Sequence, residues 1–228
     1  MSFLQNRQFV PKVDASMHSS LETINYWAFS SRQLFKSQLI LGLVAWRNGE
    51  NPCPQMEKAV DRALTSIAEL SKLNPQAVLE VDFLLENLKT VAFLVDKSPT
   101  IEINWQLIEA PDRRLDCMLA SALHTNILPD AQIDTETSKL LKSKKTTLAA
   151  KTYQAYFDLL RADKSDNIAS KVKEAEALYL DRASDSFYSG GEKAEGGGLD
   201  NGSVVDYRLA SILKKINYPG SSVHRWNW

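Results

Sequence analysis

The sequence predicts an all-α fold, a single-domain bundle of about seven to nine antiparallel helices. Apolar residues recur at spacings of three and four along most of the chain, which is typical of helices with one buried face. Gly, Pro and Asn interrupt this pattern where helices would end. The 228 residues, 44% of them apolar, are enough for one buried core, so we expect residues 1–228 to form one domain. A stack of helical hairpins is the alternative, although no fixed repeat period is visible.

The chain begins with an expected N-terminal arm, residues 1–18, which shows no sustained apolar period. A long first helix is predicted over residues 21–46, and Gly49 and Pro52 supply its end. Gly42 lies inside this helix and costs about 1 kcal/mol relative to Ala, which indicates a closely packed neighbour or a bend. We favour the closely packed neighbour.

The second and third helices follow directly. Residues 56–73 carry one apolar stripe with charged residues opposite it. The third helix is opened by Asn74 and Pro75 and runs to Val95. It is apolar around most of its circumference, so we expect it to be buried on several sides. Residues 99–110 alternate too briefly to decide between a short strand and a helical turn, and both remain open.

Further helices are predicted in the middle of the chain. One begins at Pro111 and ends at Asn126. Residues 135–162 are helical with a break near Thr146, where two adjacent β-branched residues lower the helix propensity. Apolar residues along one face mark another helix over residues 168–183.

The C-terminal part contains a loop, a helix and a tail. Residues 189–202 include six Gly and form an expected flexible, acidic loop. The last helix is predicted over residues 204–216, with Ser203 or Asp200 as its N-cap. The tail, residues 219–228, carries two tryptophans, and we expect it to fold back onto the body because free indoles would be sticky.

Composition narrows the function classes. The 27 basic and 28 acidic residues give a net charge of -1, so we expect no nucleic-acid partner. The most apolar window is too short to span a membrane, so we expect no membrane partner either, and the N-terminus shows no signal peptide pattern, which favours a cytoplasmic protein. Cys53 and Cys117 lie far apart without CxxC spacing, so we expect no disulfide, no zinc and no other metal or cofactor.

The residue patterns of common enzymes are not visible in this sequence. The three histidines, His18, His124 and His224, form no HExxH pair, and there is no GxSxG turn. We expect His124 to be a structural histidine beside an apolar helix face. The Gly-rich loop precedes a helix but lacks the GK[ST] ending and contains acids, so nucleotide binding is not expected.

One set of residues keeps an enzyme as an alternative. Asp181 and Asp185 stand one helical turn apart with Arg182 beside them, an arrangement that could hold a metal or act on a substrate. No other carboxylate or histidine completes the set. We therefore interpret these residues as a surface or salt-bridged pair and expect no enzyme.

Charge is distributed unevenly along the second half of the chain. Residues 139–151 contain five lysines and no acid, whereas residues 163–206 contain ten acids and five bases. Two solvated faces that attract each other would explain this, and so would an acidic surface for a partner. Acidic loops flanked by aromatic residues suit protein recognition. The candidate partner-binding residues are Tyr188, Glu192, Glu195, Asp200, Asn201, Asp206 and Tyr207.

A resemblance narrows the class of partner. The run ALYLDRASDSFYSGGEKAEGGGLDNGSVVDYRLASILKK, residues 177–215, and the closing HRWNW resemble the C-terminal part of all-helical immunity proteins of bacterial polymorphic toxin systems, nearest the immunity 49 group. The resemblance implies a non-enzymatic, cytoplasmic protein that binds one cognate toxin and blocks its active site or substrate access. A helical-repeat scaffold for a peptide or protein is the alternative, and an enzyme using Asp181, Arg182 and Asp185 is the second.

Overall fold

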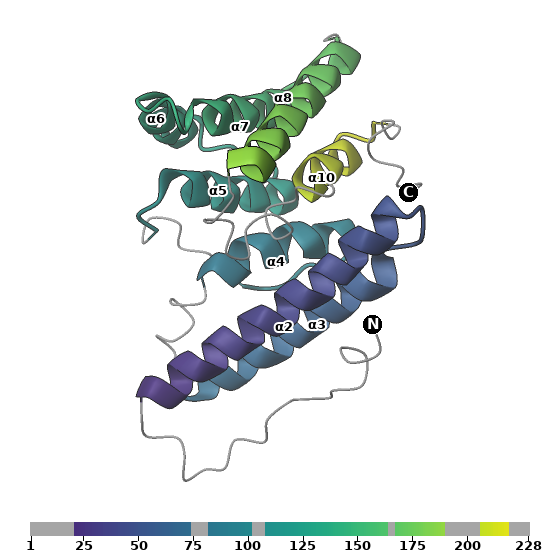
Figure 1. Cartoon of the computed structure of the whole chain (residues 1–228), viewed down its shortest axis with the longest axis vertical. Helices are drawn as coiled ribbons and strands as arrows, with labels where there is room; N and C mark the ends of the chain where they lie inside the picture. Colours follow the sequence, from purple (N-terminus) through teal and green to yellow (C-terminus); the bar gives the residue numbers. More distant parts are fainter. Residues whose placement is uncertain (1–20, 74–81, 102–107, 164–166, 190–205, 219–228) are drawn as a thin grey trace.

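The computed structural model describes residues 21–73, 82–101, 108–163, 167–189 and 206–218. Within these ranges, only the backbone is described for residues 21–29, 47, 73, 82–86 and 183–189. Within these ranges it contains eight α-helices and no strand (Figure 1), so the predicted all-α class is confirmed. The helices are α2 Leu21–Arg47, α3 Cys53–Leu73, α4 Asp82–Leu94, α5 Pro111–Thr125, α6 Asp130–Leu141, α7 Thr147–Leu160, α8 Ile168–Ser189 and α10 Tyr207–Lys215.

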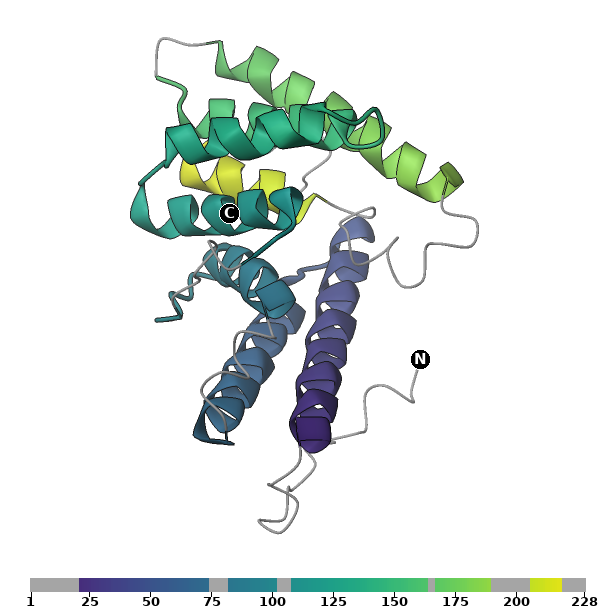
Figure 2. The same ribbon diagram turned by 90° about the vertical axis from the view of Figure 1, so that its left-hand side faces the viewer.

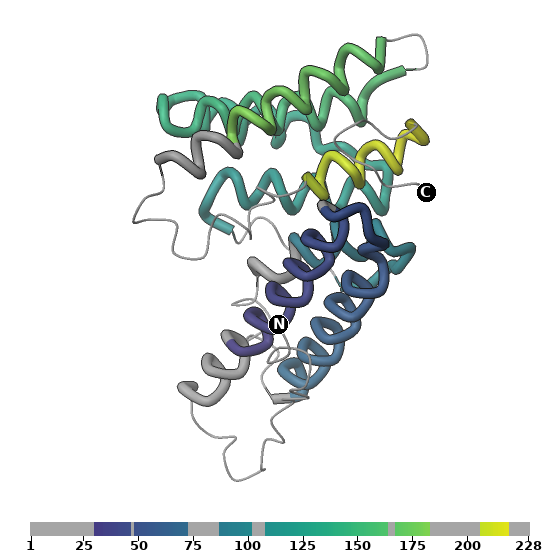
Figure 3. The backbone as a smooth tube through the Cα atoms, turned by 45° about the vertical axis from the view of Figure 1, so that its right-hand side comes forward, coloured from purple at the N-terminus to yellow at the C-terminus, as the bar shows by residue number. Residues whose placement is uncertain are grey.

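Consecutive helices pack on one another from one end of the molecule to the other. The α2–α3 hairpin forms one end, α4 and α5 follow, and α6, α7 and α8 form the other end (Figures 1 and 3). Consecutive packing of this kind also occurs in stacks of helical hairpins. The last helix departs from this order, since α10 returns to pack on α4, α5 and α7. Figure 2 shows α10, in yellow, between α5 and α7.

The α2–α3 hairpin has the predicted close packing. Gly49, with φ of +79°, follows α2 in the left-handed conformation that glycine adopts readily. A Cβ added to Gly42 would lie 3.0 Å from Cγ of Met56 on α3, so the Met56 side chain would have to shift to make room for it. Glycine therefore permits the close approach of the two helices, which confirms the closely packed neighbour.

Most helix ends lie where the sequence predicts them. Asn126, with φ of 62°, ends α5 as a left-handed C-cap. The predicted break near Thr146 is confirmed, because α6 ends at Leu141 and α7 begins at Thr147. One start was wrong: α6 begins after Pro129, whose carbonyl accepts the first helical bond, and not at Thr135.

The start of the last helix also differs from the prediction. The structure begins α10 at Tyr207, and its N-cap is Asp206, so neither Ser203 nor Asp200 is the cap. The Asp206 carboxylate accepts hydrogen bonds from the backbone N–H groups of Arg208 and Leu209 at 3.1 and 3.0 Å. It thereby satisfies two of the donors that a helix start leaves free.

Two clusters of buried apolar residues form the core, and α10 contributes to both. The first is built by α2, α3 and α4 together with Tyr207 and Ala210. The second is built by α5, α6, α7 and α8 together with Leu209, Ile212 and Leu213. The opposite faces of α10 therefore join two groups of helices.

Several predicted features are only partly described. Leu88 and Val91 of α4 are fully buried, as predicted for the third helix. Residues 99–101 and 108–110 form neither helix nor strand, and residues 102–107 lie outside the described part. The N-terminal arm, the C-terminal tail and all of the predicted loop except Ser189 also lie outside it.

Candidate functional site

The predicted partner-binding residues fall into two groups. Glu192, Glu195, Asp200 and Asn201 lie outside the described residues, and only the backbone of Tyr188 is described, within α8. The other two, Asp206 and Tyr207, are described.

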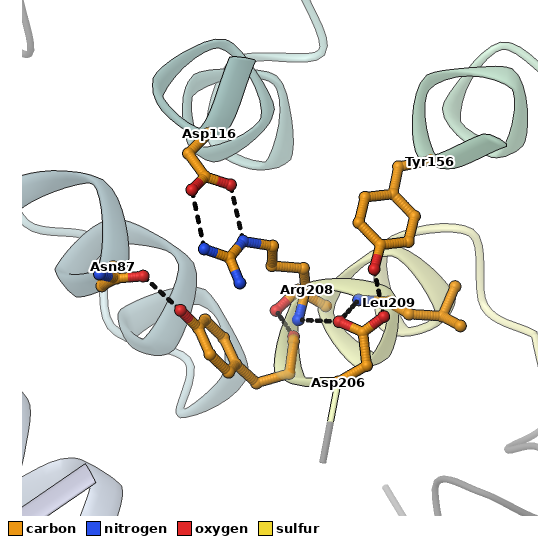
Figure 4. A network of polar contacts seen from close by, with 8 residues as sticks. Asn87, Asp116, Tyr156, Asp206, Arg208 and Leu209 are labelled. Atoms are coloured by element: carbon orange, nitrogen blue, oxygen red, sulfur yellow. Dashed lines mark hydrogen bonds and ion pairs between the residues drawn. The ribbon is translucent and has the colours of Figure 1, made fainter. Parts of the chain in front are cut away.

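These two residues do not face a partner. Their exposed fractions are 2% and 0%, so these two of the seven candidate partner-binding residues are buried and do not lie on the surface that the sequence suggested. The physical reason is that both side chains have partners inside the protein. The Tyr207 hydroxyl donates to the side-chain oxygen of Asn87 on α4, and Asp206 accepts from the Tyr156 hydroxyl on α7 (Figure 4).

An ion pair completes this network at the start of α10. The Arg208 guanidinium binds both carboxylate oxygens of Asp116 on α5, at 2.6 and 2.7 Å (Figure 4). Such two-pronged pairs are strong and fix the orientation of both side chains. Three adjacent residues, Asp206, Tyr207 and Arg208, thus attach α10 to α7, α4 and α5 respectively.

Burial keeps the Tyr156 hydroxyl of this network protonated, so that it can donate a hydrogen bond. The pKa of Tyr156 is raised well above its ordinary value, first by burial and then by the neighbouring negative charge of Asp206. The hydroxyl therefore stays protonated and donates to the carboxylate. This chemistry favours a fixed structural contact over proton transfer near neutral pH.

The C-terminal end of α10 contacts the C-terminal ends of α4 and α5. The ammonium group of Lys214 donates to the backbone carbonyls of Phe93 and Leu94, at 3.2 and 2.8 Å. That of Lys215 donates to the carbonyl of Leu123 at 2.7 Å. These carbonyls belong to the last turns of α4 and α5, where positive charge is favourable and acceptors are otherwise free.

Asp181 and Arg182, two residues of the enzyme alternative, lie in different environments. Asp181 is exposed, whereas the Arg182 guanidinium lies 5.5 Å from the centre of the buried Tyr153 ring. The side chain of Asp185 lies outside the described part. Within the described residues, no group of three or more His, Cys, Asp and Glu could hold a metal ion.

His124 has the environment of a structural histidine. Its Nε2 lies 2.9 Å from the backbone oxygen of Lys89, to which it can donate, and its ring meets Phe93 edge-on with the ring centres 5.5 Å apart. Burial lowers the pKa of His124, while the bond to the Lys89 carbonyl raises it and nearby Lys89 and Lys215 lower it. The folded protein therefore favours the neutral ring.

We expect the stability to depend on pH through this residue. Because the pKa of His124 is lower in the folded state than its ordinary value of about 6.5, the stabilisation is present above that pH and is lost as pH falls toward the folded value. Urea unfolding between about pH 8 and pH 5 should show a smaller decline for His124→Gln, which can still donate to Lys89. An identical decline in both proteins would contradict the expectation.

An open groove lies between α7 and α8. Its volume is about 500 Å³, and it is lined by Lys151, Gln154, Ala155, Asp158, Arg161, Lys171, Glu174 and Leu178. The helix α8 packs mainly on α7 and lies at the edge of the molecule (Figure 1). Its exposed side carries Leu180, whose exposed fraction is 49%, together with Glu174 and Asp181. This groove and the exposed side of α8 are called the outer face below.

No protein family matches this chain, and neither a curated protein nor a solved structure matches it. Among the described helices, none is both long and apolar enough to cross a membrane.

Proposed function

We propose that this chain is an immunity protein that binds a cognate bacterial toxin and blocks its active site or the access of its substrate. The sequence resemblance over residues 177–215 suggests the class. The observation that carries the proposal in the structure is the outer face of α7 and α8.

The outer face has the composition of a protein-binding surface. Leu180 is a large apolar side chain exposed on α8, and this helix also carries the exposed Glu174 and Asp181. An apolar centre with a polar rim is the usual arrangement of protein interfaces. The groove between α7 and α8, about 500 Å³ in volume, can receive a side chain or one edge of a partner helix.

The scaffold holds this surface in place. The inward side of α8 buries Val172, Ala175 and Tyr179 against its neighbours. Arg182 adds a contact with the face of the Tyr153 ring on α7. A surface that is fixed before binding loses less conformational entropy in the complex, which favours the tight binding that inhibition requires.

The acidic residues of the predicted loop belong to the same proposal. Glu192, Glu195 and Asp200 follow α8 directly in the chain. In this proposal their carboxylates attract a basic toxin surface, because complementary charge steers association.

The test is to purify the chain with the product of the adjacent gene. Leu180→Asp places a charge where the apolar centre of the interface should be, so we expect binding to weaken by about 2 kcal/mol or more, roughly thirtyfold. Ile127→Asp, at an even more exposed apolar residue between α5 and α6, is the matched control and should bind normally. Affinity is measured by titration, and protection by survival of cells that express the toxin.

The outcomes separate the alternatives. Equal binding and equal protection by Leu180→Asp and the wild type would exclude the outer face as the interface. Binding of a partner without protection from any toxin would instead favour the helical scaffold, whose consecutive helix packing the structure shares.

A further inference from the structure

A second exposed surface carries a concentrated positive charge. Residues 137–157 contain five lysines and no acid. Lys139 pairs with Glu136 at 2.7 Å. The other four, Lys142, Lys144, Lys145 and Lys151, are exposed, and their side chains form no ion pair or hydrogen bond in the described structure. Lys151 lines the groove of the outer face, and the other three, Lys142, Lys144 and Lys145, are called the lysine patch.

The lysine patch lies at a projecting turn. Its three residues lie in the connection between α6 and α7, which projects at one end of the upper helices (Figure 3). Leu141 lies at the start of this connection, and its exposed fraction is 47%. The surface therefore combines unpaired positive charges with an exposed apolar side chain.

We propose that the lysine patch and Leu141 dock on the anionic headgroup surface of a membrane. Each lysine near such a surface strengthens binding by about fivefold. Long lysine side chains place their ammonium groups among the headgroups, while an apolar residue between them reaches the edge of the hydrocarbon region. The inference is independent of toxin binding.

The details of the patch favour lipid over other anionic partners. Protein interfaces are depleted in lysine, especially at their centres. Single-stranded nucleic acid is held by exposed aromatic residues that stack on bases, but Tyr153 and Tyr156 of α7 are buried. Leu141 would gain nothing from a phosphate backbone. The net charge of -1 does not oppose this docking, because the patch is local and charges more than about 10 Å away are screened.

Cosedimentation of the full chain with vesicles tests the proposal. We expect binding to phosphatidylcholine vesicles containing about 30% phosphatidylserine, little binding to phosphatidylcholine alone, and weakening as salt rises. Replacing Lys142, Lys144 and Lys145 together by Gln should reduce binding on the order of a hundredfold. Leu141→Gln should reduce it severalfold.

The control variant removes three positive charges from parts of the surface outside the lysine patch. Lys58, Lys72 and Lys173 are exposed outside the patch, and replacing all three by Gln should leave vesicle binding within about twofold of wild type. Equal losses in the two triple variants would overturn the proposal, since net charge alone would then explain binding. So would an absence of preference for phosphatidylserine, or stronger binding to duplex DNA or polyglutamate than to the vesicles.

Discussion

Asp116→Ala should reduce the free energy of unfolding by about 3 to 5 kcal/mol, because it leaves the Arg208 guanidinium buried without a carboxylate. The side chains of Arg208 and Asp116 are only 13% and 11% exposed, and the pair is bidentate. Arg208 cannot remove this unfavourable buried charge by losing a proton, because arginine stays protonated in proteins. Burial disfavours its charge, yet Asp116 holds the pKa of Arg208 well above its ordinary value.

A surface ion pair provides the control. Arg161 and Asp130 are 2.6 Å apart, but their side chains are 31% and 61% exposed. Water and salt screen such a pair, so Asp130→Ala should cost no more than about 1 kcal/mol. Urea unfolding at neutral pH measures both variants. The double variant Asp116→Ala/Arg208→Met, which removes the buried charge, should recover part of the loss. Similar small losses for Asp116→Ala and Asp130→Ala would show that the buried pair is not important for stability.

The helices could be predicted because their signals are local. A helical period is visible within a few turns, and ends such as Asn126 and Gly49 carry their own backbone preference. The start of α10 was harder to predict from the sequence. Asp200, Ser203 and Asp206 are all suitable caps by residue type, and the structure uses the one whose carboxylate also meets Tyr156, fifty positions away in the chain.

The candidate site was harder to predict than the helices, because it depends on contacts between residues that are far apart in the sequence. Asp206 and Tyr207 follow a polar, Gly-rich segment, so their residue types suggested a surface. Nothing near them in the sequence indicates that Asn87 and Tyr156 lie opposite, and the same holds for Asp116 and Arg208, which are 92 positions apart. The charge of the lysine patch was visible in the sequence, but its exposure and lack of partners were not.

Tyr207→Ala should be the most damaging single truncation in α10, with an expected loss of about 3 to 5 kcal/mol. Its ring is fully buried in the first core cluster, although the helix that carries it also belongs to the second. Tyr207→Phe keeps the ring and removes the hydroxyl that donates to Asn87, so it should cost only about 1 kcal/mol. Urea unfolding of the two variants separates the packing contribution from the hydrogen bond.

Hydrogen exchange then tests whether α10 makes the two groups of helices one cooperative unit. Tyr207 contacts the cluster formed by α2, α3 and α4, whereas α7 belongs to the other cluster. If α10 couples them, Tyr207→Ala should lower the protection of buried amides in α3 and α7 by the same free energy, because both open only when the whole fold opens. A loss in α3 with unchanged protection in α7 would show two independent units. Equal losses are expected, since Arg208 and Leu209 on the same helix turn bind α5 and the second cluster and cannot stay in place once Tyr207 is displaced.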